Sequence, residues 1–100
     1  MIIGSDGKVG FADTKTTESD TFIYSLIKRD QLEFLKSVGD LCPAGYVVCF
    51  RNIQRVVFFK WTLLMSVQPG QSLKPDDGVD LGGLHGFSIK KIFLASKPQL

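Results

Sequence analysis

The sequence has few of the side chains that usually carry catalysis or bind metal ions. It holds one histidine, His85, and two cysteines, Cys42 and Cys49. The spacing of the cysteines matches neither a CxxC pair nor the disulfide framework of a small secreted domain. Cys49 stands in an apolar run and Cys42 precedes a proline. We therefore expect one small buried side chain and one loop thiol rather than a structural bridge between them.

The sequence also lacks a long uncharged hydrophobic run. Its most apolar stretch, residues 45–67, is interrupted by Arg51, Arg55 and Lys60, whereas a membrane-spanning helix needs about 20 largely uncharged residues. The start, Met1-Ile2, shows neither the basic and apolar regions of a signal peptide nor the Met-Gly that N-myristoylation requires. We expect no transmembrane segment and no signal peptide in this chain.

The rest of the composition is typical of a folded domain. A chain of 100 residues with 44% hydrophobic side chains and eight phenylalanines can build a core, and its length suits one domain. We expect residues 1–100 to form a single globular domain, as a fragment of a longer protein. The net charge of +2 is too small to indicate an acidic partner by itself. Residues 41–75, however, carry four basic side chains and no acidic one.

The apolar stretch at the centre of the chain predicts a β-hairpin. Residues 46–50 are aromatic and β-branched, which suits a strand, and Asn52 tolerates the left-handed backbone of a tight turn. Residues 55–67 predict a second strand, because every odd position from Val57 onward is apolar. The even positions are mixed, so we expect one face of this strand, with Trp61, in the core and the other face partly in water.

Weaker patterns flank this hairpin. Asp6-Gly7 between apolar residues predicts a small hairpin over residues 2–13, followed by a polar loop over 14–20 and a strand over 21–28 with apolar residues on both faces. Residues 68–86 contain five glycines and two prolines, which predicts a long, mobile loop. Residues 87–96 predict the last strand.

One segment has a helical pattern. Leu32, Leu35 and Val38 recur at helical spacing, with Phe34 and Leu41 widening the apolar stripe. Asp30 is the expected N-terminal cap, and Glu33 stands three residues later, where it would complete a capping box. The helix is expected to end near Gly39 or at the Cys42-Pro43 step.

These elements follow one another as three strands, a helix, two strands, a loop and a final strand. Strands before and after a single helix predict an α+β domain, with a mainly antiparallel sheet of about five or six strands and one helix packed on it. The alternative architecture is a partly closed barrel or split sandwich whose helix plugs one end.

Three motifs resemble chemical sites, but each lacks a necessary part. His85 has no serine or cysteine nucleophile in a recognisable motif near it. The glycines of the GGLHG segment, residues 82–86, lead into a predicted strand, whereas phosphate-binding loops open a helix. The acidic residues of segment 76–80 lack the alternating spacing and the distal glutamate of a calcium loop. We expect no catalytic residue, no cofactor and no metal ion.

The basic side chains of the central hairpin are the best candidate surface. The tip of a hairpin projects from a rigid scaffold, where recognition residues are often found. Its basic and aromatic residues could also hold single-stranded nucleic acid, but the aromatic pattern of RNA-recognition domains is absent and Trp61 is assigned to the core. The predicted interaction surface consists of Arg51, Asn52, Arg55 and Lys60.

The run FIYSLIKRDQLEFLKSVGDLCPAGYVVCF, residues 22–50, together with the basic hairpin after it, resembles a domain of the immune mapped protein family of apicomplexan parasites. The resemblance implies a non-enzymatic antigen held at the parasite's plasma membrane through an acylated N-terminus. Met1-Ile2 stands where such an anchor needs glycine, so the chain is expected to be an internal or C-terminal piece of such a protein. No functional residue follows from the resemblance.

The leading hypothesis is a monomeric, non-enzymatic interaction or scaffold domain, whose partner is another protein or an anionic membrane surface. The first alternative is a module that binds nucleic acid or an anionic surface through the hairpin of residues 51–60, and of these two ligands nucleic acid is the less favoured. A small enzyme that uses His85 is the least favoured hypothesis.

Overall fold

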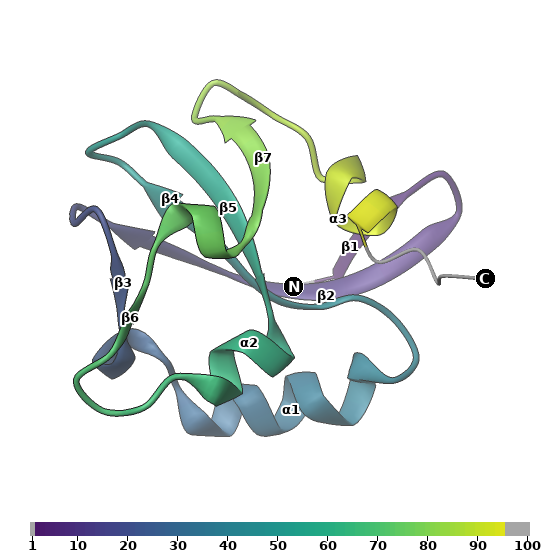
Figure 1. Ribbon diagram of the computed structural model, residues 1–100. Helices are drawn as coiled ribbons and strands as arrows, with labels where there is room; N and C mark the ends of the chain where they lie inside the picture. The colour runs from purple at the N-terminus through teal and green to yellow at the C-terminus, as the bar shows by residue number, and fades with distance from the viewer. Residues whose placement is uncertain (1, 96–100) are drawn as a thin grey trace.

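A six-stranded sheet forms the centre of the molecule in a computed structural model that describes residues 2–95 (Figure 1). The strands lie in the order β1-β2-β4-β5-β7-β8, and every neighbouring pair is antiparallel except β2 and β4, which are parallel. The prediction of an α+β fold is therefore confirmed, although the sheet is mixed rather than purely antiparallel. The strands are β1 (Ile2–Ser5), β2 (Lys8–Thr17), β4 (Ala44–Phe50), β5 (Arg55–Lys60), β7 (Val79–Gly83) and β8 (Gly86–Phe87).

The parallel pair determines how the first half of the chain is arranged. Since β2 and β4 run in the same direction, the chain between them must return to the starting end of the sheet. It does so through β3 (Phe22–Ile23), a short 3-10 helix (Tyr24–Leu26) and α1 (Arg29–Gly39). The predicted polar loop over residues 14–20 is wrong in its first part, because β2 extends to Thr17 beside β4. The predicted strand over 21–28 is wrong beyond Ile23.

Helix α1 is present where its apolar spacing predicts it. Leu32 and Leu35 are buried, whereas Phe34 is 53% exposed, so the buried stripe is narrower than predicted. The predicted capping box is wrong: Lys28 occupies the cap position without a side-chain hydrogen bond, and Asp30 lies inside the first turn. A carboxylate there still interacts favourably with the positive end of the helix dipole.

The predicted strand over residues 55–67 is wrong after Lys60, where α2 (Trp61–Ser66) begins. Leucine and methionine favour a helix over a strand, and a short apolar run fits either period. Leu64 in this helix and Val67 directly after it are buried. Trp61 is only half-buried, so it does not have the fully buried position predicted for it.

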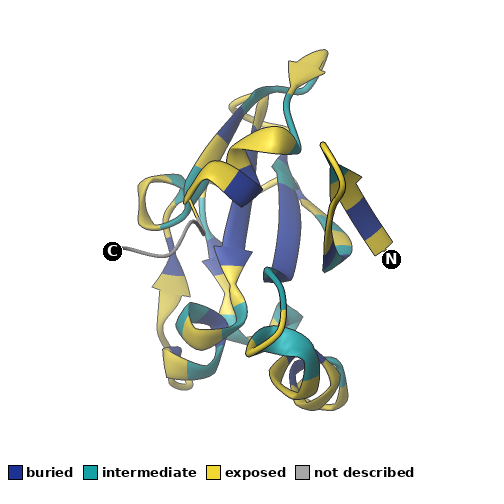
Figure 2. Cartoon of the chain, turned by 90° about the vertical axis from the view of Figure 1, so that its right-hand side faces the viewer, coloured by how far each residue is buried: buried dark blue, intermediate teal, exposed yellow. Residues whose placement is uncertain are grey.

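Both faces of the central strands are buried (Figure 2), so the prediction of a partly wet face is wrong. Val57 and Phe59 pack in the core under α1 and α2, whereas Val56 and Phe58 pack with α3 (Lys90–Ala95). The alternating pattern of residues 56–59 therefore assigns each side chain to one of two cores rather than to core and solvent.

The second half of the chain contains more regular structure than its glycines and prolines predict. The predicted loop over 68–86 is wrong: β6 (Ser72–Leu73) pairs with β3, a 3-10 helix spans Pro75–Asp77, and β7 joins the main sheet. A Cβ atom on Gly78 would lie 2.6 Å from the backbone oxygen of Phe58. The absence of a side chain at position 78 therefore lets the chain before β7 lie close to the backbone of β5. The predicted strand over 87–96 is also wrong, because α3 begins at Lys90; residue 96 lies outside the described residues.

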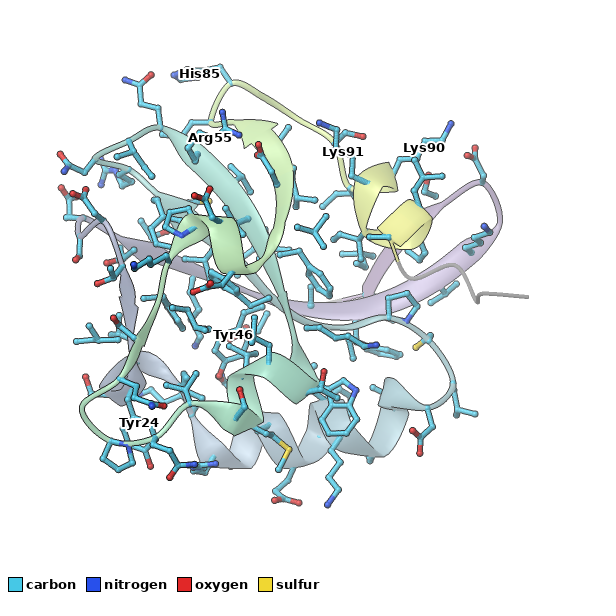
Figure 3. The ribbon with its side chains drawn as sticks, in the orientation of Figure 1. Tyr24, Tyr46, Arg55, His85, Lys90 and Lys91 are labelled. Atoms are coloured by element: carbon cyan, nitrogen blue, oxygen red, sulfur yellow. The ribbon has the colours of Figure 1, made fainter. Side chains whose placement is uncertain are left out.

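A buried phenol joins the sheet to the start of α1 (Figure 3). The Tyr46 hydroxyl donates a hydrogen bond to Gln31 Oε1 at 2.7 Å and accepts one from the backbone N–H of Lys28 at 3.1 Å. Burial raises the pKa of the Tyr46 hydroxyl above its ordinary value, although the bond from Lys28 works in the opposite direction. The protonated phenol thus fixes the first turn of α1 against β4.

We predict that Tyr46→Phe lowers the free energy of unfolding by about 1–2 kcal/mol at neutral pH, because Lys28 N–H and Gln31 Oε1 lose a buried partner. Since the folded pKa lies above the unfolded one, the hydroxyl supports folding fully below about pH 10 and loses that contribution as the pH rises further. Urea unfolding at neutral and alkaline pH should therefore show a smaller alkaline loss in Tyr46→Phe than in the wild type. Tyr24→Phe, which removes an exposed hydroxyl that accepts a bond from Arg29, is the control; equal alkaline losses in all three proteins would contradict the assignment.

The contact between α1 and α2 depends on a glycine. A Cβ atom on Gly39, at the end of α1, would overlap the indole of Trp61 in α2. The absence of a side chain at position 39 therefore lets α2 lie close against α1.

We predict that Gly39→Ala displaces the indole and lowers the free energy of unfolding by about 1–3 kcal/mol, as inserted core methyl groups do. Because Trp61 is the sole tryptophan, its fluorescence emission should also change. Gly86→Ala is the matched control, since nothing lies within 4 Å of a Cβ there. Unchanged emission and stability in Gly39→Ala would show that α2 does not rest on this glycine.

Candidate interaction surface

The structure brings three of the four predicted surface residues together. Arg51 and Asn52 lie in the turn between β4 and β5, and Arg55 begins β5. Lys60 ends β5 and pairs with Gly45, so it lies roughly 16 Å farther along the strand at about 3.3 Å per residue. The candidate surface is therefore the hairpin end, residues 51–55, and Lys60 lies outside it.

Three polar residues of the hairpin end each meet an acidic residue from another part of the chain. Arg51 Nη1 lies 3.2 Å from Glu18 Oε1, and Asn52 Nδ2 donates to Asp20 Oδ1 at 2.9 Å. Arg55 forms an ion pair with Asp80 of β7. The local absence of acidic residues in the sequence is thus compensated in the folded protein. Residues 41–75 alone could not reveal this compensation, because all three carboxylates lie outside them.

These pairs are too exposed to contribute much stability. The side chains of Arg51 and Glu18 are 62% and 79% exposed, and those of Arg55 and Asp80 are 44% and 50% exposed. Exposed ion pairs of this kind contribute about 0–1 kcal/mol. Their main effect is to orient the arginine and asparagine side chains at the surface.

An open hollow with a volume of about 630 Å³ lies beside the hairpin end. Three separated segments form its walls: the chain before β3, the hairpin itself, and the stretch from Lys74 to Asp80. Ile53, which is 40% exposed, gives the hollow an apolar edge. The hollow is lined by Asp20, Thr21, Ile53, Arg55, Val57, Lys74, Pro75, Asp76, Gly78 and Asp80.

The far wall of the hollow is fixed by its own hydrogen bonds. The backbone N–H of Lys74 donates to Asp77 Oδ2 at 2.7 Å, and Asp77 N–H donates to the Lys74 carbonyl at 3.0 Å. The glycines and prolines of this stretch predict a mobile loop, so the sequence does not indicate the hollow. The residues Pro75-Asp76-Asp77-Gly78, which suit a β-turn, are the one sequence signal of local order here.

The structure gives His85 no chemical partner. His85 is exposed in the turn between β7 and β8, and its side chain points away from the sheet (Figure 3). Leu84 and His85 form that hairpin turn, Gly83 and Gly86 pair across it, and Gly82 within β7 has a positive φ of 121°. Among residues 2–95, no hydrogen bond reaches the imidazole of His85.

The acidic and sulfur-bearing side chains are dispersed. Asp76 and Asp77 lie in the 3-10 helix, whereas Asp80 pairs with Arg55. Within the described part of the chain, no group of three or more His, Cys, Asp or Glu side chains could hold a metal ion. Cys42 and Cys49 are both free and half-buried.

Comparison with known proteins adds no assignment. No protein-family model, curated protein or solved structure matches the chain. The resemblance to the immune mapped protein family therefore stays a prediction. No helix among residues 2–95 is long and apolar enough to cross a membrane.

Proposed function

We propose that the chain is a non-enzymatic interaction domain that binds a partner protein through the hairpin end and the hollow beside it. The observation that carries this proposal is the arrangement of Arg51, Asn52 and Arg55, each oriented by an acidic residue from a distant segment. Ile53 projects among them at the edge of the hollow. An exposed apolar side chain framed by oriented polar groups is the usual composition of a protein-binding site.

The charge of this surface favours a protein over an anionic partner. Its basic residues are Arg51, Arg55 and Lys74. Its acidic residues, Glu18, Asp20, Asp76 and Asp80, outnumber them by one. Nucleic acids and anionic lipids are attracted by a positive excess, which the folded surface does not have. Binding through the hairpin end should accordingly depend only weakly on salt concentration.

The alternative partner, an anionic membrane surface, is suggested by the family resemblance of the sequence. The resemblance to immune mapped proteins suggests an antigen held at a parasite's plasma membrane, where an interaction domain would meet both lipid and protein. On that view, this domain supplies a recognition surface at the membrane. The balanced charges of the hairpin end favour protein as the ligand in that setting too.

We predict that Ile53→Asp combined with Arg55→Glu weakens partner binding at least about tenfold, which corresponds to about 1.4 kcal/mol. The measurement is quantitative mass spectrometry of proteins retained by the immobilised domain from extracts of the cells that make it. Each specific binder is then purified and its affinity measured by calorimetry. Lys8→Glu is the matched control, because Lys8 is exposed and lies in the β1–β2 hairpin.

The proposal requires a protein that binds the wild type and Lys8→Glu but not the double variant. An identical set of retained proteins on all three domains would contradict it. In parallel, the wild type is mixed with vesicles of phosphatidylcholine and phosphatidylserine and with single-stranded oligonucleotides. Strong, salt-sensitive binding to either would favour the anionic alternative instead.

A further inference from the structure

The β2 strand has a free edge over its second half. β1 pairs with β2 only from Lys8 to Phe11, whereas β4 pairs with β2 from Phe11 to Thr17. Beyond Phe11, the described residues therefore place a strand on one side of β2 only. Among residues 2–95, no strand covers the other side of residues 13–17.

The register identifies the backbone groups at this edge. Ser5 and Lys8 flank the two-residue turn Asp6-Gly7, so they form a mutually hydrogen-bonded pair, and such pairs alternate along an antiparallel ladder. Even-numbered residues of β2 therefore direct their N–H and C=O groups away from β4. Two observed bonds agree, since Phe11 N–H donates to Pro43 and Thr17 C=O accepts from Arg51, both on the β4 side.

Thr14 and Thr16 consequently present their backbone N–H and C=O groups at the free edge, and both residues are exposed. Groups of this kind are a template for an added strand. The odd-numbered neighbours, Asp13 and Lys15, direct their side chains to the face of the sheet that carries α1, as Phe11 does.

A groove separates this edge from α1. It encloses a hollow of about 260 Å³ between residues 11–13 of β2 and the first half of α1. Its apolar part is formed by Phe11 and Phe34, whose rings meet edge to face at 5.6 Å. Because Phe34 is 53% exposed, the groove has an apolar wall that residues 2–95 leave largely uncovered.

The polar part of the groove carries two carboxylates, one of which is paired with Lys15. Asp13 and Asp30 line it. Asp13 Oδ2 is buried and accepts no hydrogen bond from any described residue, although Lys15 Nζ lies 2.8 Å away. A buried carboxylate oxygen without a well-aligned donor is uncommon in folded proteins. A cationic side chain entering the groove would meet Asp30 and the exposed part of the Asp13 side chain.

We propose that the free edge of β2 and the groove beside it bind an extended peptide segment of a partner protein. The peptide adds a strand next to residues 13–17 through the backbone of Thr14 and Thr16. It places one apolar side chain against Phe11 and Phe34, and a lysine or arginine near Asp13 and Asp30. Addition of a strand with side-chain pockets on one face is an established mode of peptide recognition.

The strand geometry restricts the peptide sequence. Side chains two residues apart lie on the same face, so the apolar residue and the basic residue must be separated by one residue. A second copy of this chain fits less well. The groove-facing residues of its β2 along the free edge are Asp13, Lys15 and Thr17, none of which can fill the apolar part. The inference concerns a surface separate from the hairpin end and does not depend on the proposed function.

The test uses a synthetic library of peptides about seven residues long, enough to cover the edge at about 3.3 Å per residue. Threonine is fixed at alternate positions, and the remaining positions are randomised. The library is applied to the wild type, Thr14→Pro, Thr14→Ala and Phe34→Ala. Thr14→Pro removes an outward N–H that β4 does not use, whereas Thr14→Ala keeps it. Protected amides of β4 in each variant report that the fold is retained.

We expect the wild type and Thr14→Ala to select peptides with an apolar residue two positions from a lysine or arginine. Thr14→Pro and Phe34→Ala should bind the selected peptides at least about tenfold more weakly, which corresponds to a loss of about 1.4 kcal/mol of binding free energy. Binding should slow hydrogen exchange at the Thr14 and Thr16 amides. Alternate backbone amides of the bound peptide face β2, and the others face away from it. N-methylation of the amides that face β2 should abolish binding, whereas N-methylation of the others should leave the affinity unchanged.

Four results would overturn the proposal. The first is the absence of any selected peptide, and the second is equal binding by Thr14→Pro and Thr14→Ala. The third is selection of acidic peptides, which the groove should reject. The fourth is a concentration-dependent dimer of the wild type with protected Thr14 and Thr16 amides in the absence of peptide, which would assign the edge to a second copy.

Discussion

The fold depends on the burial of β4 and β5 on both of their faces. Residues 56–59 send Val57 and Phe59 into one core and Val56 and Phe58 into the other. Burying an apolar side chain of this size stabilises the folded state by about 1.5–3 kcal/mol. Neither core can form unless a separate layer covers that face of the sheet. Helices α1 and α2 supply one layer and α3 supplies the other, so the positions of all three helices follow from this requirement.

The parts of the fold that the sequence predicts are those set by local patterns. The Asp6-Gly7 turn, the helix around Leu32 and Leu35, and the hairpin from β4 to β5 are each specified by neighbouring residues. The predictions fail where tertiary contacts decide. The run from Trp61 to Val67 fits both a strand and a helix, and only its packing on α1 distinguishes them. The glycines in and before β7 indicate a loop when they are read locally, yet Gly78, directly before β7, is needed because the backbone of β5 lies so close.

The candidate surface shows the same division between local and distant information. Arg51, Asn52 and Arg55 could be predicted because a hairpin brings its own turn residues together. Their partners Glu18, Asp20 and Asp80 could not, since β2 and β7 reach the hairpin only through the sheet. A charge count along the sequence indicated a basic surface, whereas the folded arrangement is nearly balanced. The separation of Lys60 has a simpler cause: strand length alone moves it to the other end of β5.

The parallel pairing of β2 with β4 also carries a cost in chain entropy when the protein folds. The hairpin of β4 and β5 closes through the short turn of residues 51–54, whereas Phe11 must meet Ala44 across the whole of β3 and α1. The entropic cost of closing a loop grows with the logarithm of its length. The sheet thus carries a larger closure cost at this junction than at its central hairpin. Because β2 and its neighbour β1 are joined to the rest of the sheet through this one interface, the long crossover makes these two strands the costliest part of the sheet to assemble.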